Sequence, residues 1–307
     1  MIFDQIARND IYLQNKIGNG GFGKKSSLGV VYKALWLSKN YTVACKCIDI
    51  SLKENSNSKS TIDMFLGEVA GYALCRGPFI LHIHGWSAEK LPPDHLRLLI
   101  IMEYMQKGSL TKLLQQEYNQ LTNRRKVLIA CDIVSGMHRI HQHGVIHRDI
   151  RPDNILIDNC YRAKIGDMGI SQSYYPQFGF NNSPMGCIRY MPPEFYWNTY
   201  NQTLDVFTFG LTLNHLFTGT DHNFDPNTKT TILTKISPLF PNLIRYCLNP
   251  NPNYRPSAQQ IEYILYGFRS YLEWRIQFNY QYHHLSKEQK DFFCLLVYRE
   301  RYFDINY

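Results

Sequence analysis

The chain has 307 residues, of which 44% are hydrophobic and 19% charged, the balance of a folded globular protein rather than of a disordered one. Its formal charge of +8 is spread along the sequence: residues 1–105, 106–268 and 269–307 carry surpluses of 3, 4 and 1 positive charges, so no basic stripe indicates a dedicated nucleic-acid site. No apolar run approaches the roughly 18 residues that a membrane span needs, and the first residues lack the basic start and apolar core of a secretory signal, so we expect a cytoplasmic protein.

The first hundred residues favour β-strands, because short runs rich in β-branched and apolar residues alternate with glycine-rich or polar breaks. A single helical pattern interrupts them at residues 61–74, and Gly77 and Pro78 follow its end. The predicted strands cover residues 11–17, 30–37, 42–50, 80–85 and 96–104.

From residue 110 the apolar period becomes helical, and we predict helices at residues 110–116 and 125–143. A strand-rich half followed by a helix-rich half predicts an α+β protein with two lobes and a cleft between them.

Residues 269–307 differ from the rest, since 11 of these 39 residues are aromatic. We expect this region to pack as helices against the body, or alternatively to dock on a partner or a second copy of the chain.

The cysteines lie far apart in the sequence, without the paired Cys-x-x-Cys spacing of a zinc site. A thiol within an apolar run usually packs as a small hydrophobic side chain. We therefore predict free thiols at Cys45, Cys47, Cys75, Cys131, Cys160, Cys187, Cys247 and Cys294.

A glycine-rich turn, GNGGFG at residues 18–23, stands between two predicted strands. Its glycines let backbone N–H groups approach a phosphate with no Cβ in the way, and a plain flexible turn is the alternative. It is not a dinucleotide-binding fingerprint, because a strand and not a helix follows it. It also lacks the Gly-Lys-Ser/Thr ending of a Walker A loop.

Lys46 lies among apolar neighbours on the predicted strand 42–50. Burying a lysine costs free energy unless an anion meets its charge. Two anions are available in this sequence: a phosphate of a bound ligand, and Glu68 on the helix that follows.

Two segments further along carry the strongest signal. Residues 145–156 read VIHRDIRPDNIL, and residues 164–169 read KIGDMG. With the glycine turn and Lys46 before them, in this order, they resemble the eukaryotic-type protein kinases over about residues 9–268. The resemblance implies a bilobal fold: a small β-rich N-lobe with one main helix in residues 1–105, a larger helical C-lobe in residues 106–268, and an aromatic-rich helical extension in residues 269–307.

The resemblance also implies an enzyme that transfers the γ-phosphoryl group of ATP to protein hydroxyls, with ATP and Mg²⁺ as cofactors. Lys46, held by Glu68, is expected to pair with the α- and β-phosphates. Asp149 is expected to accept or orient the proton of the substrate hydroxyl. Such catalysis consists of positioning and electrostatic stabilisation, without a covalent enzyme intermediate.

Three more residues take implied roles around the phosphates. Asn154 and Asp167 are expected to hold magnesium, for which hard oxygen ligands are suited. Arg151 stands where Ser/Thr kinases usually have lysine, and it is expected to approach the γ-phosphate. The implied catalytic set is Asp149, Lys46, Arg151, Asn154 and Asp167.

Residues 101–105 resemble the hinge between the lobes. Met102 is then the gatekeeper, while the Glu103 carbonyl and the Met105 amide bind adenine. The apolar walls of the site are equally consistent with plain core. The complete set implied for ATP is Ile17, Gly18, Gly20, Gly23, Val31, Ala44, Lys46, Glu68, Met102, Glu103, Met105 and Leu156.

The resemblance predicts supporting contacts in the C-lobe as well. Asp205 is expected to anchor the backbone of the catalytic loop. Residues 186–194 resemble the end of an activation segment, and Arg255 is expected to pair with Glu194 there. The residues implied for the internal spine of the active state are Tyr72, Ile83, His147 and Met168.

The chain departs from the family pattern at three places. Residues 24–29 lengthen the glycine loop, so that either Gly23 or Gly29 is its last glycine. Met168 replaces the usual phenylalanine of the metal-binding tripeptide and has similar bulk. Cys187 replaces a threonine that in Ser/Thr kinases commonly contacts the catalytic aspartate.

We expect Ser/Thr specificity, which Pro152 favours, with Tyr or dual specificity as the alternative. Arg148 directly before Asp149 is typical of the RD-type subclass, so autophosphorylation is expected within residues 170–187. The alternative function is a pseudokinase scaffold that binds nucleotide and protein partners without phosphate transfer. Every ionisable catalytic position is filled, which favours an active enzyme.

Overall fold

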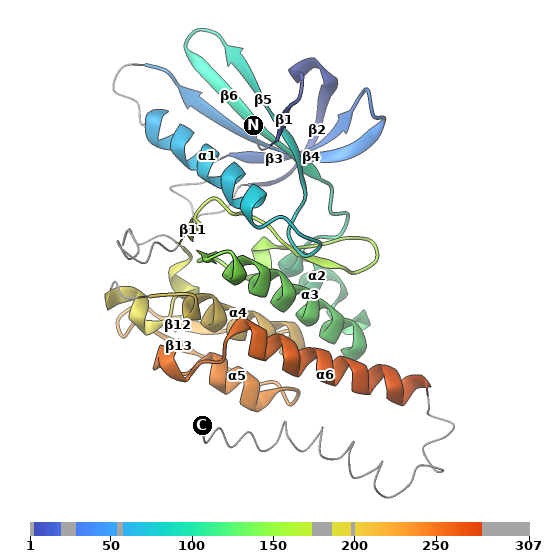
Figure 1. The fold of residues 1–307 in the computed structure, drawn as a ribbon, viewed down its shortest axis with the longest axis vertical. Helices are drawn as coiled ribbons and strands as arrows, with labels where there is room; N and C mark the ends of the chain where they lie inside the picture. The colour runs from blue at the N-terminus through green and yellow to red at the C-terminus, as the bar shows by residue number, and fades with distance from the viewer. Residues whose placement is uncertain (1–2, 20–28, 54–57, 174–185, 198–199, 278–307) are drawn as a thin grey trace, which may run out of the picture.

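The computed structural model describes residues 3–19, 29–53, 58–173, 186–197 and 200–277. Figure 1 shows two lobes, with a β-sheet and one helix above and a group of helices below. The two-lobed α+β fold predicted from the sequence is therefore confirmed. Gly20, Gly23, residues 174–185 of the predicted activation segment and residues 278–307 lie outside the described residues.

The N-lobe is built on a six-stranded sheet with the order β1-β5-β6-β4-β3-β2. All neighbours pair antiparallel except β1 and β5, which pair in parallel. The strands are β1 (Asp4–Gln5), β2 (Ile11–Asn19), β3 (Val30–Trp36), β4 (Tyr41–Ser51), β5 (Ile83–Leu91) and β6 (His95–Glu103).

Both faces of strand β4 are buried. Its side chains point alternately to the two faces, so every second residue faces the helix α1 (Ser58–Leu74). Ala44, Ile48 and Ile50 belong to the cluster that contains Phe65 of α1. Val43 and its alternate neighbours pack in a separate cluster on the other face. Lys46 lies two residues from Ala44 and two from Ile48, so its side chain points to the same face of the sheet, the one that α1 covers.

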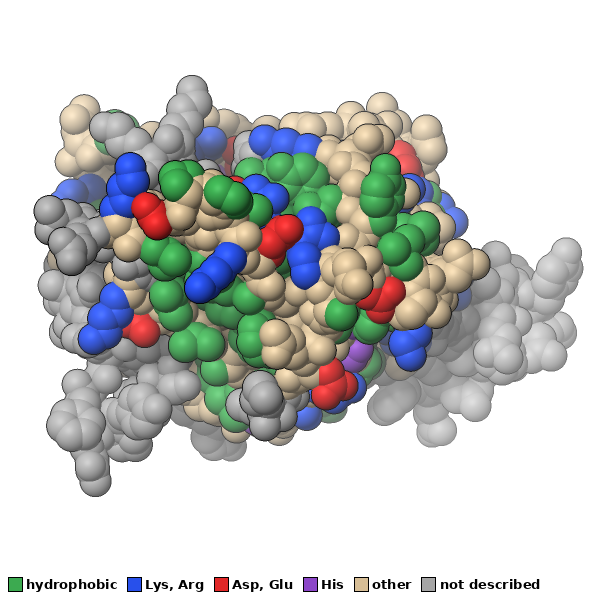
Figure 2. Space-filling model, turned by 90° about the horizontal axis from the view of Figure 1, so that it is seen from above, with side chains coloured by type: hydrophobic (Ala, Val, Ile, Leu, Met, Phe, Trp, Pro, Cys, Tyr) green, Lys and Arg blue, Asp and Glu red, His purple; other side chains and the backbone are tan. Residues whose placement is uncertain are grey.

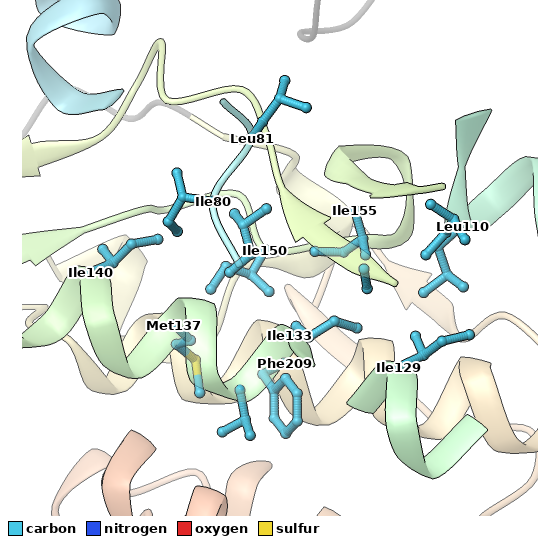
Figure 3. Close-up of a cluster of buried hydrophobic side chains, with 14 of the residues drawn as sticks. Ile80, Leu81, Leu110, Ile129, Ile133, Met137, Ile140, Ile150, Ile155 and Phe209 are labelled. Atoms are coloured by element: carbon cyan, nitrogen blue, oxygen red, sulfur yellow. The ribbon is translucent and has the colours of Figure 1, made fainter. Parts of the chain in front are cut away.

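The predicted strand at residues 80–85 is wrong at its start. The backbone of Ile80 and Leu81 pairs with Ile165 of the C-lobe strand β10 (Ala163–Ile165), and β5 begins only at Ile83. Both side chains are buried, so the apolar run is real, but its first half joins the C-lobe instead of the N-lobe sheet. Figure 3 shows these two residues above the C-lobe core.

The C-lobe core forms around helix α3, whose inward face carries Ile129, Ile133, Met137 and Ile140, all fully buried. Thr122 caps the start of α3 by accepting a hydrogen bond from the amide of Arg125. The helices are α2 (Leu110–Glu117), α3 (Asn123–Gln142), α4 (Thr203–Thr218), α5 (Pro241–Cys247) and α6 (Ala258–Gln277).

Short strands in the C-lobe and 3₁₀ turns in both lobes complete the fold, and the sequence patterns did not reveal them. The strands are β7 (Gly108–Ser109), β8 (Val145–Ile146), β9 (Ile155–Ile157), β10, β11 (Gln172–Ser173), β12 (Asn223–Asp225) and β13 (Thr230–Ile232). The 3₁₀ turns are η1 (Arg8–Asp10), η2 (Tyr118–Gln120), η3 (Pro152–Asn154), η4 (Ile188–Tyr190), η5 (Pro193–Trp197) and η6 (Pro252–Tyr254).

Helix α6 continues past residue 268, so the change in composition at residue 269 falls inside a helix. The packing of the remaining C-terminal residues stays a prediction. No helix in the described part of the chain has the length and apolar character needed to cross a membrane. The seven cysteines within the described residues are free thiols, as predicted, and Cys294 lies outside them.

Figure 2 shows the charge pattern of one face of the molecule. On the face that Figure 2 shows, basic and acidic side chains are interspersed among hydrophobic ones and form no stripe of a single sign. This face therefore gives no sign of a polyanion-binding groove.

Candidate active site

Three charged side chains from three elements meet between the lobes. The Nζ atom of Lys46 on β4 lies 2.8 and 2.7 Å from the two carboxylate oxygens of Glu68 on α1. It also lies 3.1 Å from Oδ1 of Asp167, which follows β10 in the C-lobe. All three side chains are largely buried. Lys46 thus joins the N-lobe sheet, its helix and the C-lobe through one ammonium group.

The opposite charges in this group stabilise each other, whereas burial and the neighbouring Asp167 raise the pKa of Glu68. Burial alone opposes the ammonium charge, but the carboxylates of Glu68 and Asp167 together raise the pKa of Lys46 above its ordinary value. Burial also opposes ionisation of Asp167, and the Lys46 ammonium overcomes this and lowers the pKa of Asp167. Lys46 therefore stays charged, and Asp167 stays ionised, over the physiological pH range.

Asp149 lies in the loop between β8 and β9 and is only 1% exposed. Its carboxylate accepts hydrogen bonds from Nε of Arg151 at 3.1 Å and from the side-chain amide of Asn154. The backbone amide of Cys187 lies 3.4 Å from Oδ1 of Asp149, so this residue contacts the aspartate through its main chain. The structure therefore brings the predicted catalytic loop and the end of the activation segment together.

The backbone of this loop is held from below by Asp205 on α4. The amides of His147 and Arg148 each donate to a separate oxygen of its carboxylate, both at 2.8 Å. The ring Nε2 of His147 lies 2.9 Å from the carbonyl oxygen of Gly166. Asp205 therefore anchors the backbone of the catalytic loop, as predicted, and His147 ties that loop to the segment that carries Asp167.

A cavity of about 330 Å³ opens beside the charged group. Ten of the twelve residues predicted for ATP line it, and the other two, Gly20 and Gly23, lie outside the described residues. Asn154 and Asp167 also line it, whereas Asp149 and Arg151 are absent from its lining. The predicted residues in the lining are Ile17, Gly18, Val31, Ala44, Lys46, Glu68, Met102, Glu103, Met105 and Leu156.

Sequence reasoning missed the polar rim of this cavity. Gln106, Ser109, Lys112 and Asp153 line it, and Nη1 of Arg151 forms an ion pair with Asp153. Their residue types do not indicate a role at the cavity. Only their positions in the chain, just after the hinge or inside the catalytic loop, could have indicated it.

The hinge residue Glu103 has a second role that the sequence did not indicate. Its carboxylate accepts two hydrogen bonds from Nζ of Lys164 on β10, at 2.7 and 2.8 Å, and one from the backbone amide of His82 at 2.6 Å. The hinge is therefore tied to the C-lobe strand that leads to Asp167.

Comparison with known proteins decides the family. A model of the protein kinase domain matches residues 12–266. The chain belongs to the protein kinase domain family. The resemblance found in its motifs is thereby confirmed, and with it the bilobal kinase fold.

Three of the relatives of this kinase carry serine/threonine or dual-specificity names. Serine/threonine-protein kinase pakE of Dictyostelium discoideum is 27% identical over 259 residues, which cover 80% of this chain and 26% of pakE. Serine/threonine-protein kinase CTR1 of Arabidopsis thaliana is 32% identical over 214 residues, 68% of this chain and 24% of CTR1. Dual specificity protein kinase shkB of Dictyostelium discoideum is 30% identical over 282 residues, 84% of this chain and 40% of shkB. The chain spans less than half the length of each of these relatives.

The four residues predicted for the spine of this kinase are all buried. Tyr72, Ile83 and Met168 belong to one hydrophobic cluster, and the hydroxyl of Tyr72 accepts a hydrogen bond from the amide of Asp167 at 2.7 Å. Met168 is fully buried beside Gly71 of α1. Methionine thus fills the place of the usual phenylalanine.

Only glycine fits position 29 of this kinase. Its φ is +103°, and a Cβ there would lie 2.6 Å from the carbonyl oxygen of Cys47. This requirement favours Gly29 as the last glycine of the phosphate loop.

The donors available to magnesium in this kinase are few. The described residues contain no group of three or more His, Cys, Asp and Glu side chains that could hold a metal ion. Asp167 and Asn154 offer hard oxygen ligands at the cavity. The amide nitrogen of Asn154 donates to Asp149, which leaves its side-chain oxygen as the atom able to ligate a cation. The residues therefore fit a magnesium ion that takes its other ligands from phosphates and water.

Proposed function

We propose that this protein is an active kinase that transfers the γ-phosphoryl group of ATP to serine or threonine hydroxyls of protein substrates. The observation that carries the proposal is the Lys46–Glu68–Asp167 group at the wall of a cavity, with Asp149 and Asn154 beside it. A scaffold that only bound nucleotide would have no need of the buried carboxylate of Asp149.

Each residue has a role that its surroundings support. Lys46 is fixed by two carboxylates and presents its charge to the α- and β-phosphates of ATP. Asp149, whose carboxylate is oriented by Arg151 and Asn154, accepts or orients the proton of the substrate hydroxyl. Mg²⁺, when bound, neutralises charge on the phosphates.

The remaining roles concern the nucleotide and the phosphate that moves. Asn154 and Asp167 hold Mg²⁺, and Arg151 stabilises the charge of the transferring group. Met102, Glu103 and Met105 bind adenine at the hinge. The other residues that contact ATP are Ile17, Gly18, Gly20, Gly23, Val31, Ala44, Glu68 and Leu156.

Relatives support Ser/Thr acceptors, since pakE and CTR1 are named serine/threonine-protein kinases. Dual specificity is the second candidate, which the name of shkB favours. Arg148 before Asp149 supports control by phosphorylation within residues 170–187. The regions 1–105, 106–268 and 269–307 are proposed as N-lobe, C-lobe and a C-terminal extension that docks on the body or a partner.

Transfer of radiolabelled phosphate tests this function. The chain is incubated with labelled ATP, Mg²⁺ and myelin basic protein, beside a matched Asp149→Asn chain. We expect label on phosphoserine and phosphothreonine, and on residues 170–187 of the kinase itself, only with the unaltered chain. No labelling by either chain would support the scaffold instead, and equal labelling by both would contradict the role given to Asp149.

The pH dependence of the transfer is expected to report the ionisation of Asp149. Burial raises the pKa of this carboxyl, and the Arg151 guanidinium opposes the rise. Because Asp149 acts as a carboxylate, kcat/KM falls as the pH drops through its raised pKa. Arg151→Met removes the opposing charge, so the acid limb of the pH profile moves to higher pH. The control Arg97→Met, in an ion pair on the N-lobe, leaves that limb in place. An acid limb that stays or moves to lower pH in Arg151→Met contradicts the assignment.

A further inference from the structure

Arg148, the residue before Asp149, has a backbone that a residue with a Cβ rarely adopts. Its φ is +68°, in the left-handed region. Such a conformation persists only where the surrounding structure over-determines it. The groups that hold Arg148 therefore also fix the backbone from which Asp149 projects.

Contacts from three separate segments hold Arg148, whose side chain is buried. Its amide donates to Asp205 at 2.8 Å, and its Nε donates to the carbonyl oxygen of Ile170 at 2.5 Å. Its Nη1 donates to the hydroxyl of Tyr200 at 3.3 Å. Asp205 belongs to α4 and Ile170 to the start of the activation segment, while Tyr200 lies in the segment that leads into α4.

The ring of Tyr200 is held in place by its own packing. It is 4% exposed and belongs to a buried cluster with Ile146, Met191, Phe195 and Leu204. Its ring stacks on that of Phe195, with centroids 5.7 Å apart. Because the ring cannot move freely, its hydroxyl meets Arg148 with little further loss of conformational freedom.

We propose that Tyr200 is a positioning residue for phosphate transfer: its hydroxyl holds Arg148, and through Arg148 the backbone that presents Asp149. This inference rests on the proposed function and adds to it a residue that no catalytic motif contains. The phenol is part of the fold, so its contact with Arg148 does not require a phosphate on the activation segment. The hydrogen bond from Arg148 to Tyr200 thus stabilises the catalytic loop before any phosphorylation.

The chain offers a matched control four residues away. Tyr196 also has a buried hydroxyl, but among the described residues that hydroxyl has no hydrogen-bond partner. Its ring contacts Phe195 and Lys229, and Tyr196→Phe preserves both contacts. Tyr196→Phe and Tyr200→Phe therefore remove the same atom, and only the second breaks a bond to Arg148.

Steady-state kinetics with ATP and myelin basic protein compare the two variants in the full chain, after phosphatase treatment. Tyr200→Phe is expected to lower kcat about tenfold, the effect of leaving a buried charged donor without one acceptor. The KM for ATP changes less than twofold, because neither Tyr200 nor Arg148 lines the cavity. Tyr196→Phe leaves both constants unchanged.

Two further measurements separate positioning from a general loss of stability. In an Arg148→Ala background, Tyr200→Phe is expected to lower kcat less than twofold, because the two residues act through one contact. Hydrogen exchange of the peptide covering residues 145–151 is expected to be faster in Tyr200→Phe than in Tyr196→Phe.

The inference is overturned if Tyr200→Phe and Tyr196→Phe have equal kcat, or if the effects of Tyr200→Phe and Arg148→Ala are fully additive. If the unaltered chain transfers no phosphate, the proposed function fails, and hydrogen exchange alone decides the role of Tyr200. Equal exchange of residues 145–151 in the two variants then overturns it, and faster exchange in Tyr200→Phe supports it.

Discussion

Lys46→Met is expected to lower kcat for phosphate transfer by about 100- to 1000-fold, the usual effect of removing one preorganised charge from a transition state. The side chain removed is the one that joins Glu68 on α1 to Asp167 in the C-lobe. Methionine keeps the length of the aliphatic chain and removes only the ammonium group. Two buried carboxylates then face each other without a cation, so the pKa of each rises.

Two matched variants give this prediction its control. Glu68→Gln keeps the shape of the side chain and leaves Lys46 its bond to Asp167, so we expect a smaller loss, about 10- to 100-fold. Lys33→Met removes an ammonium from the neighbouring strand β3, where Nζ lies over the ring of Tyr104, and is expected to change kcat less than threefold. All variants are compared by initial rates at saturating ATP. A Lys46→Met chain that keeps more than a tenth of the normal kcat contradicts the assigned role.

The N-lobe shows how far local sequence patterns reach. The β-branched runs that became β2, β3, β4 and β6 were predicted within two residues at each end, because each is bounded by glycine or polar residues. The helix at 61–74 was predicted with its end correct, since Gly77 and Pro78 stop it. Strand β5 was predicted too short, because its second half, Ser87–Leu91, has the sequence SAEKL and lacks β-branched residues.

The contacts that complete the site depend on pairs of residues far apart in the chain. Glu103 meets Lys164 across 61 positions, and Arg148 meets Tyr200 across 52. No local period or spacing joins such pairs, because the fold alone brings them together. The ion pair of Lys46 and Glu68 was predicted because a buried lysine requires an anion, and the resemblance in the motifs implied the same pair. The resemblance also implied the contact of Arg255 with Glu194 and that of Asp205 with the catalytic loop. Long-range contacts were therefore found where a charge must be matched or where a family motif marks both partners.

The ion pair of Glu194 and Arg255 makes the largest expected difference to stability. Arg255 precedes α6, and its guanidinium donates to both carboxylate oxygens of Glu194 at the end of the activation segment. Their side chains are 2% and 0% exposed. Glu194→Ala leaves Arg255 as a buried cation without its carboxylate, and the free energy of unfolding is expected to fall by about 3–5 kcal/mol.

Chemical denaturation measures this loss, and an exposed pair supplies its control. Asp49→Ala breaks the bidentate pair with Arg97 on the N-lobe, where Asp49 is 51% exposed, and is expected to cost only about 0–1 kcal/mol. The double replacement Glu194→Leu with Arg255→Met removes both buried charges, so the protein should recover most of the stability that Glu194→Ala loses. The loss in Glu194→Ala therefore measures the cost of an unmatched charge and not the strength of the pair. The guanidinium carbon of Arg255 lies 5.0 Å from the centre of the Phe207 ring, so this side chain also contributes packing. If the double variant were no more stable than Glu194→Ala, lost packing around Arg255 would account for the loss instead.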